Sequence, residues 1–124
     1  MTVSAIGIAC KNIEKSIQFY NLLNLDFKEY GKGHYEATQE NGLRIMLDSF
    51  DLLKQINKDW KEPINSGITL CFQQTSPNEV DKLFHRIVDA GFEIEKSPWD
   101  AFWGQRYASV KDPNGNQIDL FAQI

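Results

Sequence analysis

The sequence predicts an α+β fold made of two tandem copies of one βαβββ unit, and three observations support this prediction. A short apolar stretch followed by an amphipathic stretch with helical periodicity occurs twice, in residues 3–23 and 67–90. Short stretches with alternating apolar and polar residues follow each of them. The two halves also end alike, because residues 41–47 match residues 114–120 at four of seven positions, an offset of 73. We therefore expect paired curved sheets around a cleft, with the helices outside.

The first half is predicted to be a strand, a helix and three further strands. Residues 3–10 are short, apolar and partly β-branched, and Asn12 offers a side chain that can cap the helix after it. That helix should run for about eleven residues, because apolar residues recur at intervals of three and four. These residues are Ile13, Ile17, Tyr20 and Leu23. The three strands are expected over residues 25–30, 34–38 and 43–47, with Asn41-Gly42 as the hairpin turn between the last two.

The second half repeats the same order. A strand is expected over residues 67–72, and Ser76-Pro77 starts a helix with a cap and a proline in its first turn. Gly91 ends this helix. Its apolar stripe, at an offset of 67 from the first one, is Val80, Phe84, Ile87 and Ala90. The remaining strands are expected over residues 94–98, 105–110 and 117–121, with a turn at residues 112–115.

The length of 124 residues is that of one ordinary domain. Hydrophobic residues make up 42% and charged residues 24%, which is typical of globular proteins and excludes a disordered chain. We expect a single domain over residues 1–124, with a first unit over about 1–50 and a second over about 67–124. The polar segment 51–66 is predicted to connect them and to hold a short helical turn around residues 52–56.

Charge and hydropathy exclude several classes of partner. The net charge of -4 argues against nucleic-acid binding, which requires a basic surface. The longest apolar stretch, residues 5–10, is far shorter than the roughly 20 residues that cross a bilayer, so no membrane partner is expected. The first residues lack the pattern of a signal peptide, which favours a cytoplasmic location. Cys10 and Cys71 lie far apart in apolar runs and are interpreted as buried hydrophobic residues.

Strand alternation sorts the side chains between the two faces of each sheet. If the apolar residues of the last strand in each unit face the helices, Arg44, Met46, Asp119 and Phe121 face the cleft. The helix-facing set is Ile45, Leu47, Ile118 and Leu120. For the first strand of each unit, the helix-facing set is Ile6, Ile8, Ile68 and Leu70, and the cleft-facing set is Ala5, Gly7, Gly67, Thr69 and Cys71. Two such bare faces, from one chain or from two, would enclose the cleft.

The chain resembles the vicinal oxygen chelate superfamily, which includes glyoxalases, bleomycin resistance proteins and extradiol dioxygenases. The resemblance rests on the duplicated unit, on Phe19-Tyr20, on Ala90-Gly91-Phe92, and above all on residues 110–116. It covers nearly the whole chain. Trp103-Gly104 resembles a pair that bleomycin-resistance-like members carry before the seventh strand, so those metal-free members are the nearest match. The resemblance implies a small-molecule ligand and a homodimer.

Enzymes of this superfamily hold one divalent metal ion on the first and last strands of each unit. By resemblance, those positions are Ala5, Met46, Gly67 and Asp119. Three of the four have no donor atom suited to a hard cation. We therefore predict no metal, no cofactor and no catalytic residue.

Aromatic and polar side chains are the predicted ligand-binding groups. Aromatic rings give a large contact area to planar ligands. Trp103 is the favoured ring, whereas Trp99 and Phe102 are equally compatible with core positions. His85 is interpreted as a surface residue of the second helix, and Asp48 is a further polar group that could orient a ligand. The predicted binding residues are His34, Arg44, Met46, Trp60, Trp103, Arg106, Tyr107, Asp119 and Phe121.

Two interpretations of the polar residues remain open. Arg44 and Asp119 either form a mutual salt bridge or orient a polar ligand. The leading functional hypothesis is metal-independent binding of a small, partly aromatic molecule, as in drug sequestration. The alternative is a lyase, isomerase, thiol transferase or dioxygenase, either metal-dependent through a set such as His34, Glu36 and Asp119 or metal-free. A third hypothesis is an interaction or regulatory protein that uses its dimer surface.

Overall fold

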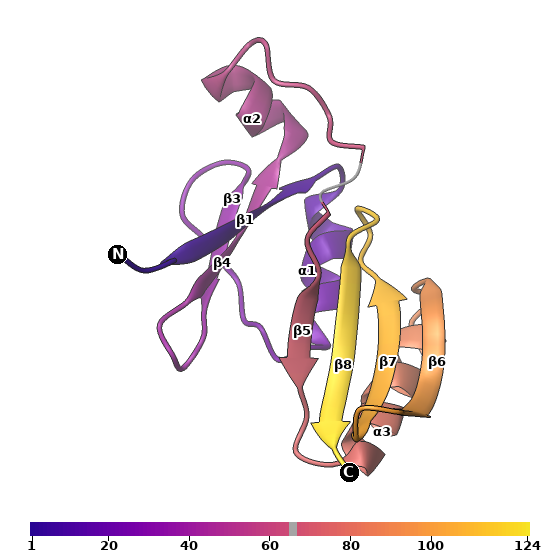
Figure 1. Cartoon of the computed structure of the whole chain (residues 1–124). Coiled ribbons are helices and arrows are strands. Elements are labelled where there is room, and N and C mark those ends of the chain that lie inside the picture. Colours follow the sequence, from indigo (N-terminus) through magenta and orange to yellow (C-terminus); the bar gives the residue numbers. More distant parts are fainter. Residues whose placement is uncertain (65–66) are drawn as a thin grey trace. The chain divides into compact units, whose positions relative to one another are not determined.

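The computed structural model describes residues 1–64 and 67–124, which fall into two compact units. Unit 1 is Met1–Ile64, and the described part of unit 2 is residues 67–124. Each unit contains a four-stranded mixed sheet, and the strand order is the same in both (Figure 1). The predicted α+β fold of two βαβββ units is therefore confirmed.

In unit 1 the sheet has the order β1-β4-β3-β2, with β1 parallel to β4 and the other pairs antiparallel. The elements are β1 (Ala5–Cys10), α1 (Ile13–Asn21), β2 (Lys28–Glu29), β3 (His34–Thr38), β4 (Arg44–Ser49) and α2 (Phe50–Ile56). Asn12 caps α1 as predicted, because its side chain accepts a hydrogen bond from the backbone N–H of Lys15. The connector does hold a short helix, α2, capped by Ser49.

In unit 2 the sheet has the order β5-β8-β7-β6, with β5 parallel to β8. The elements are β5 (Leu70–Gln73), α3 (Pro77–Asp89), β6 (Ile94–Ala101), β7 (Gln105–Lys111) and β8 (Gln117–Gln123). The Ser76 hydroxyl caps α3 by accepting from the Glu79 N–H, and Pro77 occupies the first turn, as predicted. The tight turn between β7 and β8 is confirmed, because Asp112 Oδ1 accepts from the backbone N–H groups of Asn114 and Asn116 at 2.9 Å each.

Two predicted strands are shorter in the structure. After α1, Asn24 adopts a left-handed conformation (φ 63°) and the Leu25 N–H donates to the Tyr20 carbonyl. This turn ends the helix and places Leu25 in the core. Because Leu25 belongs to the end of the helix, β2 has only two residues. In unit 2, Gly67 has a φ of 69° and Ile68 is 65% exposed, so the prediction that Ile68 packs toward a helix is wrong.

The repeat between the two helices has a different register from the predicted one. The caps Asn12 and Ser76 differ by 64 positions rather than 67. The same offset aligns the buried positions of the two helices, which are Ser16, Phe19, Tyr20 and Leu23 in the first and Val80, Leu83, Phe84 and Ile87 in the second. The predicted stripes were displaced by three residues, which is close to the 3.6 residues of one turn, so an amphipathic pattern persisted. Ile13 and Ile17 are half-buried, and Ala90 is exposed.

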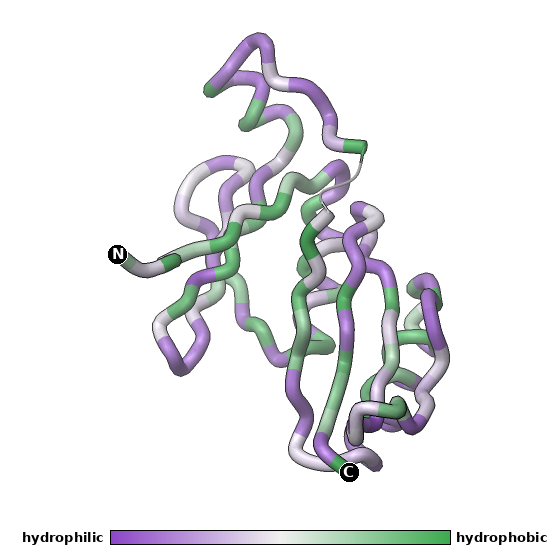
Figure 2. The backbone as a smooth tube through the Cα atoms, viewed as in Figure 1, coloured by the Kyte–Doolittle hydropathy of each residue, from purple (hydrophilic) through white to green (hydrophobic). Residues whose placement is uncertain are grey.

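The sheets follow the predicted offset of 73. Ala37 pairs with Ile45 in unit 1, and Val110 pairs with Ile118 in unit 2. The four residues expected to face the helices, Ile45, Leu47, Ile118 and Leu120, are at most 2% exposed. Figure 2 shows the alternation along β8 as successive purple and green segments. Within residues 1–64 and 67–124, no helix is long and apolar enough to cross a lipid bilayer.

Candidate functional site

Unit 2 carries a group of aromatic rings on the sheet face opposite α3. Ala108 and Val110 of β7 are buried beneath the helix, so Tyr107 points to the other face. Tyr107 is in register with Phe121 of β8, and the two rings stack with centroids 6.2 Å apart and planes 26° apart. We call Trp103, Tyr107 and Phe121 the aromatic face.

The β6–β7 hairpin adds Trp103 to this face. Gly104 has a φ of 88°, which a turn residue without a side chain adopts readily. The Trp103 ring lies edge-on to Tyr107, with centroids 5.3 Å apart, and its Nε1–H donates to Gln105 Oε1 at 2.8 Å. Trp103 is 47% exposed, so its ring is both oriented and accessible.

The neighbouring aromatic residues differ in their exposure. Phe102 is 91% exposed and contacts Trp103 edge-on, so it does not occupy a core position. Trp99 is half-buried against Trp103, with centroids 5.5 Å apart. Within residues 1–64 and 67–124, no acceptor lies within hydrogen-bonding distance of its buried Nε1–H.

Asp119 anchors the polar side of the aromatic face. Asp119 is 6% exposed, and its carboxylate accepts hydrogen bonds from Tyr107 Oη (2.6 Å), Ser109 Oγ (2.7 Å) and Gln117 Nε2 (3.0 Å). Burial, together with this hydrogen bond, raises the pKa of Tyr107 well above its usual range. The Tyr107 hydroxyl therefore keeps its proton and remains a donor to Asp119.

Cys71 borders the same group of side chains. It is in register with Asp119, and its Sγ lies 3.9 Å from Tyr107 Oη. Cys71 is exposed, so the prediction that it is a buried hydrophobic residue is wrong, whereas Cys10 is buried as predicted. The physical reason is strand parity, because Leu70 and Phe72 take the helix side of the short strand β5.

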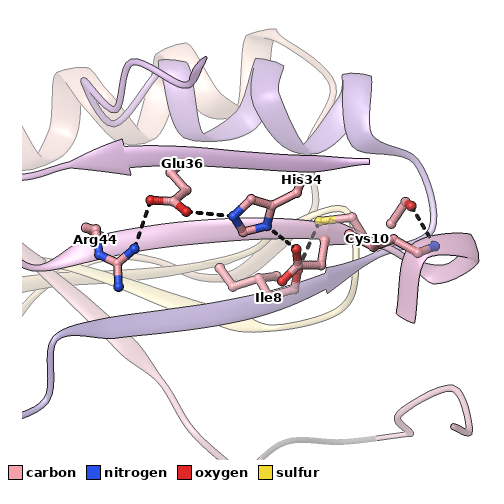
Figure 3. Close-up of polar contacts among 8 residues, drawn as sticks. Ile8, Cys10, His34, Glu36 and Arg44 are labelled. Atoms are coloured by element: carbon pink, nitrogen blue, oxygen red, sulfur yellow. Dashed lines mark hydrogen bonds and ion pairs between the residues drawn. The ribbon is translucent and has the colours of Figure 1, made fainter. Parts of the chain in front are cut away.

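Unit 1 carries a chain of charged side chains at the corresponding place. His34 Nε2 lies 2.6 Å from Glu36 Oε2, and its Nδ1 contacts Asp48. Glu36 Oε1 accepts from Arg44 Nη1 at 2.9 Å (Figure 3). All four side chains are partly exposed, and we call them the charged face.

The two carboxylates determine the electrostatics of the charged face. The hydrogen bond to Asp48, followed by that to Glu36, raises the pKa of His34 above its ordinary value of 6.5. The hydrogen bonds from His34 and Arg44 lower the pKa of Glu36 from 4.5. The contacts of this face therefore favour the charged forms of both His34 and Glu36.

The offset of 73 shows that the two faces occupy equivalent positions in the repeat. Met46 of β4 corresponds to Asp119, and Asp48 corresponds to Phe121. The remaining equivalent pairs are His34 with Tyr107, Glu36 with Ser109, and Arg44 with Gln117. The same backbone arrangement thus presents several charged side chains in unit 1 and aromatic and polar side chains around the single carboxylate of Asp119 in unit 2.

The positions at which the superfamily binds a metal ion do not offer a suitable donor set. The helix-cap offset of 64 makes Thr69, rather than Gly67, the equivalent of Ala5, which corrects the predicted position. Unit 1 then supplies Ala5 and the thioether of Met46, and unit 2 supplies a hydroxyl and Asp119, which already accepts three hydrogen bonds. Hard divalent cations prefer several oxygen or imidazole ligands, so these residues do not fit one.

In the described ranges, 1–64 and 67–124, no group of three or more His, Cys, Asp or Glu side chains is arranged so that it could hold a metal ion. Of the alternative set considered from the sequence, His34 and Glu36 contact each other in unit 1. Asp119 belongs to unit 2 and has its own donors there.

Three further predicted residues lie away from both faces or have different partners. Arg106 points to the α3 side of β7 because it alternates with Tyr107, and its guanidinium binds Asp81 at 3.0 and 3.2 Å and Asp100 at 3.2 Å. Trp60 packs against Phe50 of α2, with ring centroids 5.1 Å apart. Of the pair considered above, Arg44 binds Glu36 within unit 1, and Asp119 accepts a hydrogen bond from Tyr107 within unit 2.

Sequence reasoning missed several supporting residues. Ser109 and Gln117 donate to Asp119, and Asp81 binds Arg106. The signal for the first two was available, because they alternate with buried residues on strands whose register the turn at residues 112–115 fixes.

Comparisons with known proteins agree with this architecture. Residues 2–120 match the family model described as Glyoxalase/Bleomycin resistance protein/Dioxygenase superfamily. The Mycobacterium bovis protein Mb0911c is 30% identical over 90 residues, which are 73% of this chain and 59% of that protein. Bacillus subtilis YraH is 25% identical, with full coverage of both chains. The chain spans a little over half the length of the mycobacterial relatives.

Solved structures are similar in fold. A glyoxalase/bleomycin resistance protein/dioxygenase from Nocardioides has a TM-score of 0.79 at 21% identity and covers 100% of this chain and 84% of its own. A glyoxalase-related enzyme from Fulvimarina pelagi has a TM-score of 0.85 at 18% identity, with coverage of 98% and 88%. At these identities the likeness concerns the fold alone.

Proposed function

Because the chain belongs to the Glyoxalase/Bleomycin resistance protein/Dioxygenase superfamily, we propose that it binds a small, partly aromatic molecule without a metal ion, as in drug sequestration. The observation that carries this proposal is the aromatic face of unit 2. Trp103 is held by Gln105 and Tyr107 is held by Asp119, yet the Trp103 ring remains 47% exposed.

The chemistry of this face suits a planar ligand. Rings whose positions are fixed by hydrogen bonds offer stacking area at a low cost in conformational entropy. The Tyr107–Phe121 stack and the edge-on Trp103 ring form surfaces of different orientation, which favours a ligand with a ring and a substituent. The net charge of -4 is compatible with a cationic substituent.

The donor set at the metal positions supports binding rather than metal-assisted catalysis. Met46 and Ala5 supply no hard donor in unit 1, and Asp119 already accepts three hydrogen bonds in unit 2. A lyase, isomerase, thiol transferase or dioxygenase that depends on a divalent ion would need ligands that these residues do not provide.

Titration of intrinsic tryptophan fluorescence with planar aromatic compounds and glycopeptide-like compounds tests the proposal. We expect saturable quenching in metal-depleted protein. Quenching should be lost in Trp103→Leu and kept in Trp60→Leu, a matched control in which the altered ring packs on Phe50 in unit 1. Unchanged emission across the library, or equal quenching in Trp103→Leu, would contradict it.

We also propose that the protein is a cytoplasmic homodimer. An exposed thiol at Cys71 suits a reducing compartment, and the exposed hydrophobic residues Phe102 and Ile124 favour self-association. Light scattering coupled to size-exclusion chromatography is expected to give twice the mass of the 14.3 kDa chain. A monomeric mass at micromolar concentration would contradict the dimer without affecting the binding proposal.

A further inference from the structure

Strand β6 carries an exposed lysine on the same side of the sheet as the aromatic face. Lys96 is in register with Ser109 of β7, and Trp99 is in register with Tyr107. Ser109 and Tyr107 are two residues apart on β7 and therefore share a face. The register of β6 shifts between Lys96 and Trp99, so these two side chains reach that same face although they are three residues apart. Lys96 is thus a neighbour of the aromatic face.

The Lys96 ammonium is held close to Trp103. Its Nζ lies over the Trp99 ring, 4.7 Å from the ring centroid. The face of an aromatic ring attracts a cation, so this contact orients the long side chain. Trp99 also contacts the Trp103 ring, with centroids 5.5 Å apart. The ammonium and the Trp103 ring are therefore separated by one aromatic side chain, and both Lys96 and Trp103 are exposed.

The charge of Lys96 differs from its charged neighbours on β6 in having no ionic partner. Glu95 lies 3.4 Å from Lys111, and Asp100 lies 3.2 Å from Arg106. In the part of the chain that the structure describes, no carboxylate lies within ion-pair distance of the Lys96 ammonium. An exposed cation beside the aromatic rings is therefore available to an anionic group of a ligand.

The repeat gives Lys96 a counterpart in unit 1 that faces a different residue. Lys28 of β2 is in register with Glu36, and Glu36 is the equivalent of Ser109 in the repeat. Unit 1 thus places a lysine opposite a carboxylate, whereas unit 2 places a lysine opposite a hydroxyl. The same backbone position therefore lacks an acidic neighbour across the strands only in the unit that carries the aromatic face.

We propose that Lys96 determines the ligand class of the aromatic face by binding an anionic substituent, so that an aromatic carboxylate is preferred to a neutral or cationic compound of the same shape. The net charge of -4 belongs to the whole chain, and charges farther away than about 10 Å are largely screened at about 0.1 M salt. The local cation therefore decides the selectivity. This inference rests on the proposed function, because the ring of the ligand has to lie on the aromatic face.

Three naphthalene compounds substituted at the same ring position test the inference: naphthoate, its neutral amide naphthamide, and the cation naphthylmethylammonium. Dissociation constants are measured with the metal-depleted full chain from the shift of the Trp103 indole N–H signal, so that a bound metal ion cannot cause a preference for the carboxylate. We expect naphthoate to bind about two- to fivefold more tightly than naphthamide, and the cation to bind most weakly. Added sodium chloride should reduce this preference, because salt screens exposed charges.

Three variants assign the preference to Lys96. Lys96→Met keeps an apolar side chain beside Trp99 and removes the charge, so naphthoate and naphthamide should bind equally. Lys96→Arg should retain the preference for naphthoate. Lys28→Met is the matched control, because it removes the same charge from the equivalent exposed position of unit 1, and it should leave the preference unchanged.

The outcomes separate this inference from the proposed function. Equal binding of the three compounds, tighter binding of the cation, or a preference for naphthoate that persists in Lys96→Met would overturn the role of Lys96 and leave the aromatic face as a binding site. If no compound shifted the Trp103 signal, the binding proposal would fail and the inference with it. If Lys96→Met does not fold, Lys96→Gln, which also removes the charge, decides the question.

Discussion

Tyr107 donates a 2.6 Å hydrogen bond to Asp119, and this contact joins the aromatic and polar parts of unit 2. Asp119 is 6% exposed and its carboxylate accepts hydrogen bonds from three donors, whereas the tyrosine ring stacks on Phe121. A single side chain thus satisfies a buried charge and supplies stacking area. The contact therefore gives Asp119 a structural role in unit 2 as an acceptor.

Tyr107→Phe separates these two roles. The variant keeps the ring and removes the donor, so the buried carboxylate loses one of its three hydrogen bonds. We expect the free energy of unfolding to fall by about 1–3 kcal/mol, the usual cost of leaving a buried charged acceptor undersatisfied. Urea unfolding measures this, with the exposed Tyr30→Phe as the control. A loss no larger than that of the control would show that the hydrogen bond carries no stability.

Arg106→Met tests the placement of Arg106 on the helix side of the sheet. The guanidinium binds Asp81 through two nitrogens, so its loss should reduce the free energy of unfolding by about 1 kcal/mol. Quenching of tryptophan fluorescence by a bound ligand should be unchanged, because the side chain points away from the aromatic face. The control is Lys82→Met, which removes an exposed 3.5 Å pair with Glu79. If ligand binding were weaker in Arg106→Met but not in Lys82→Met, Arg106 would belong to the binding site.

The charged face should make stability depend on pH in two opposite ways. The pKa of His34 is raised in the folded protein, so its contribution is complete below pH 6.5 and is lost as the pH rises through the folded value. The pKa of Glu36 is lowered, so its contribution is present above pH 4.5 and is lost as the pH falls through the folded value. The contributions of His34 and Glu36 together predict that the free energy of unfolding is greatest between pH 4.5 and pH 6.5.

Urea unfolding from pH 4 to pH 9 measures this dependence. In His34→Gln the loss of stability on the alkaline side should disappear, whereas His85→Gln, an exposed position on α3, should retain it. The same alkaline slope in wild type and His34→Gln would assign the effect to other groups.

Local signals predicted much of this fold, and longer-range geometry accounts for the rest. The caps Asn12 and Ser76 were predictable because a cap is a local contact. The side chain of the capping residue accepts a hydrogen bond from the backbone N–H three residues later. The faces of β4 and β8 were predictable because a period of two leaves only two choices. The helix register was not, since a displacement of three residues nearly reproduces the 3.6-residue period.

The candidate site was predictable to a lesser degree. Alternation alone places Arg106 and Tyr107 on opposite faces, and sequence reasoning grouped them because it considered only their chemistry. The contact between His34 and Asp48 requires the β3–β4 register, which the Asn41-Gly42 turn sets but which composition does not reveal. The partners of a side chain depend on the register between neighbouring strands, which cannot be predicted from the periodicity within one strand.

The central claim is tested most directly by following the three tryptophan indole N–H signals in metal-depleted protein while an aromatic compound is added. The account predicts that the Trp103 signal shifts and saturates, that the Trp60 signal stays in place, and that adding a divalent metal ion changes neither result. A response that appears only after the metal ion is added, or that affects Trp60 and spares Trp103, would contradict it.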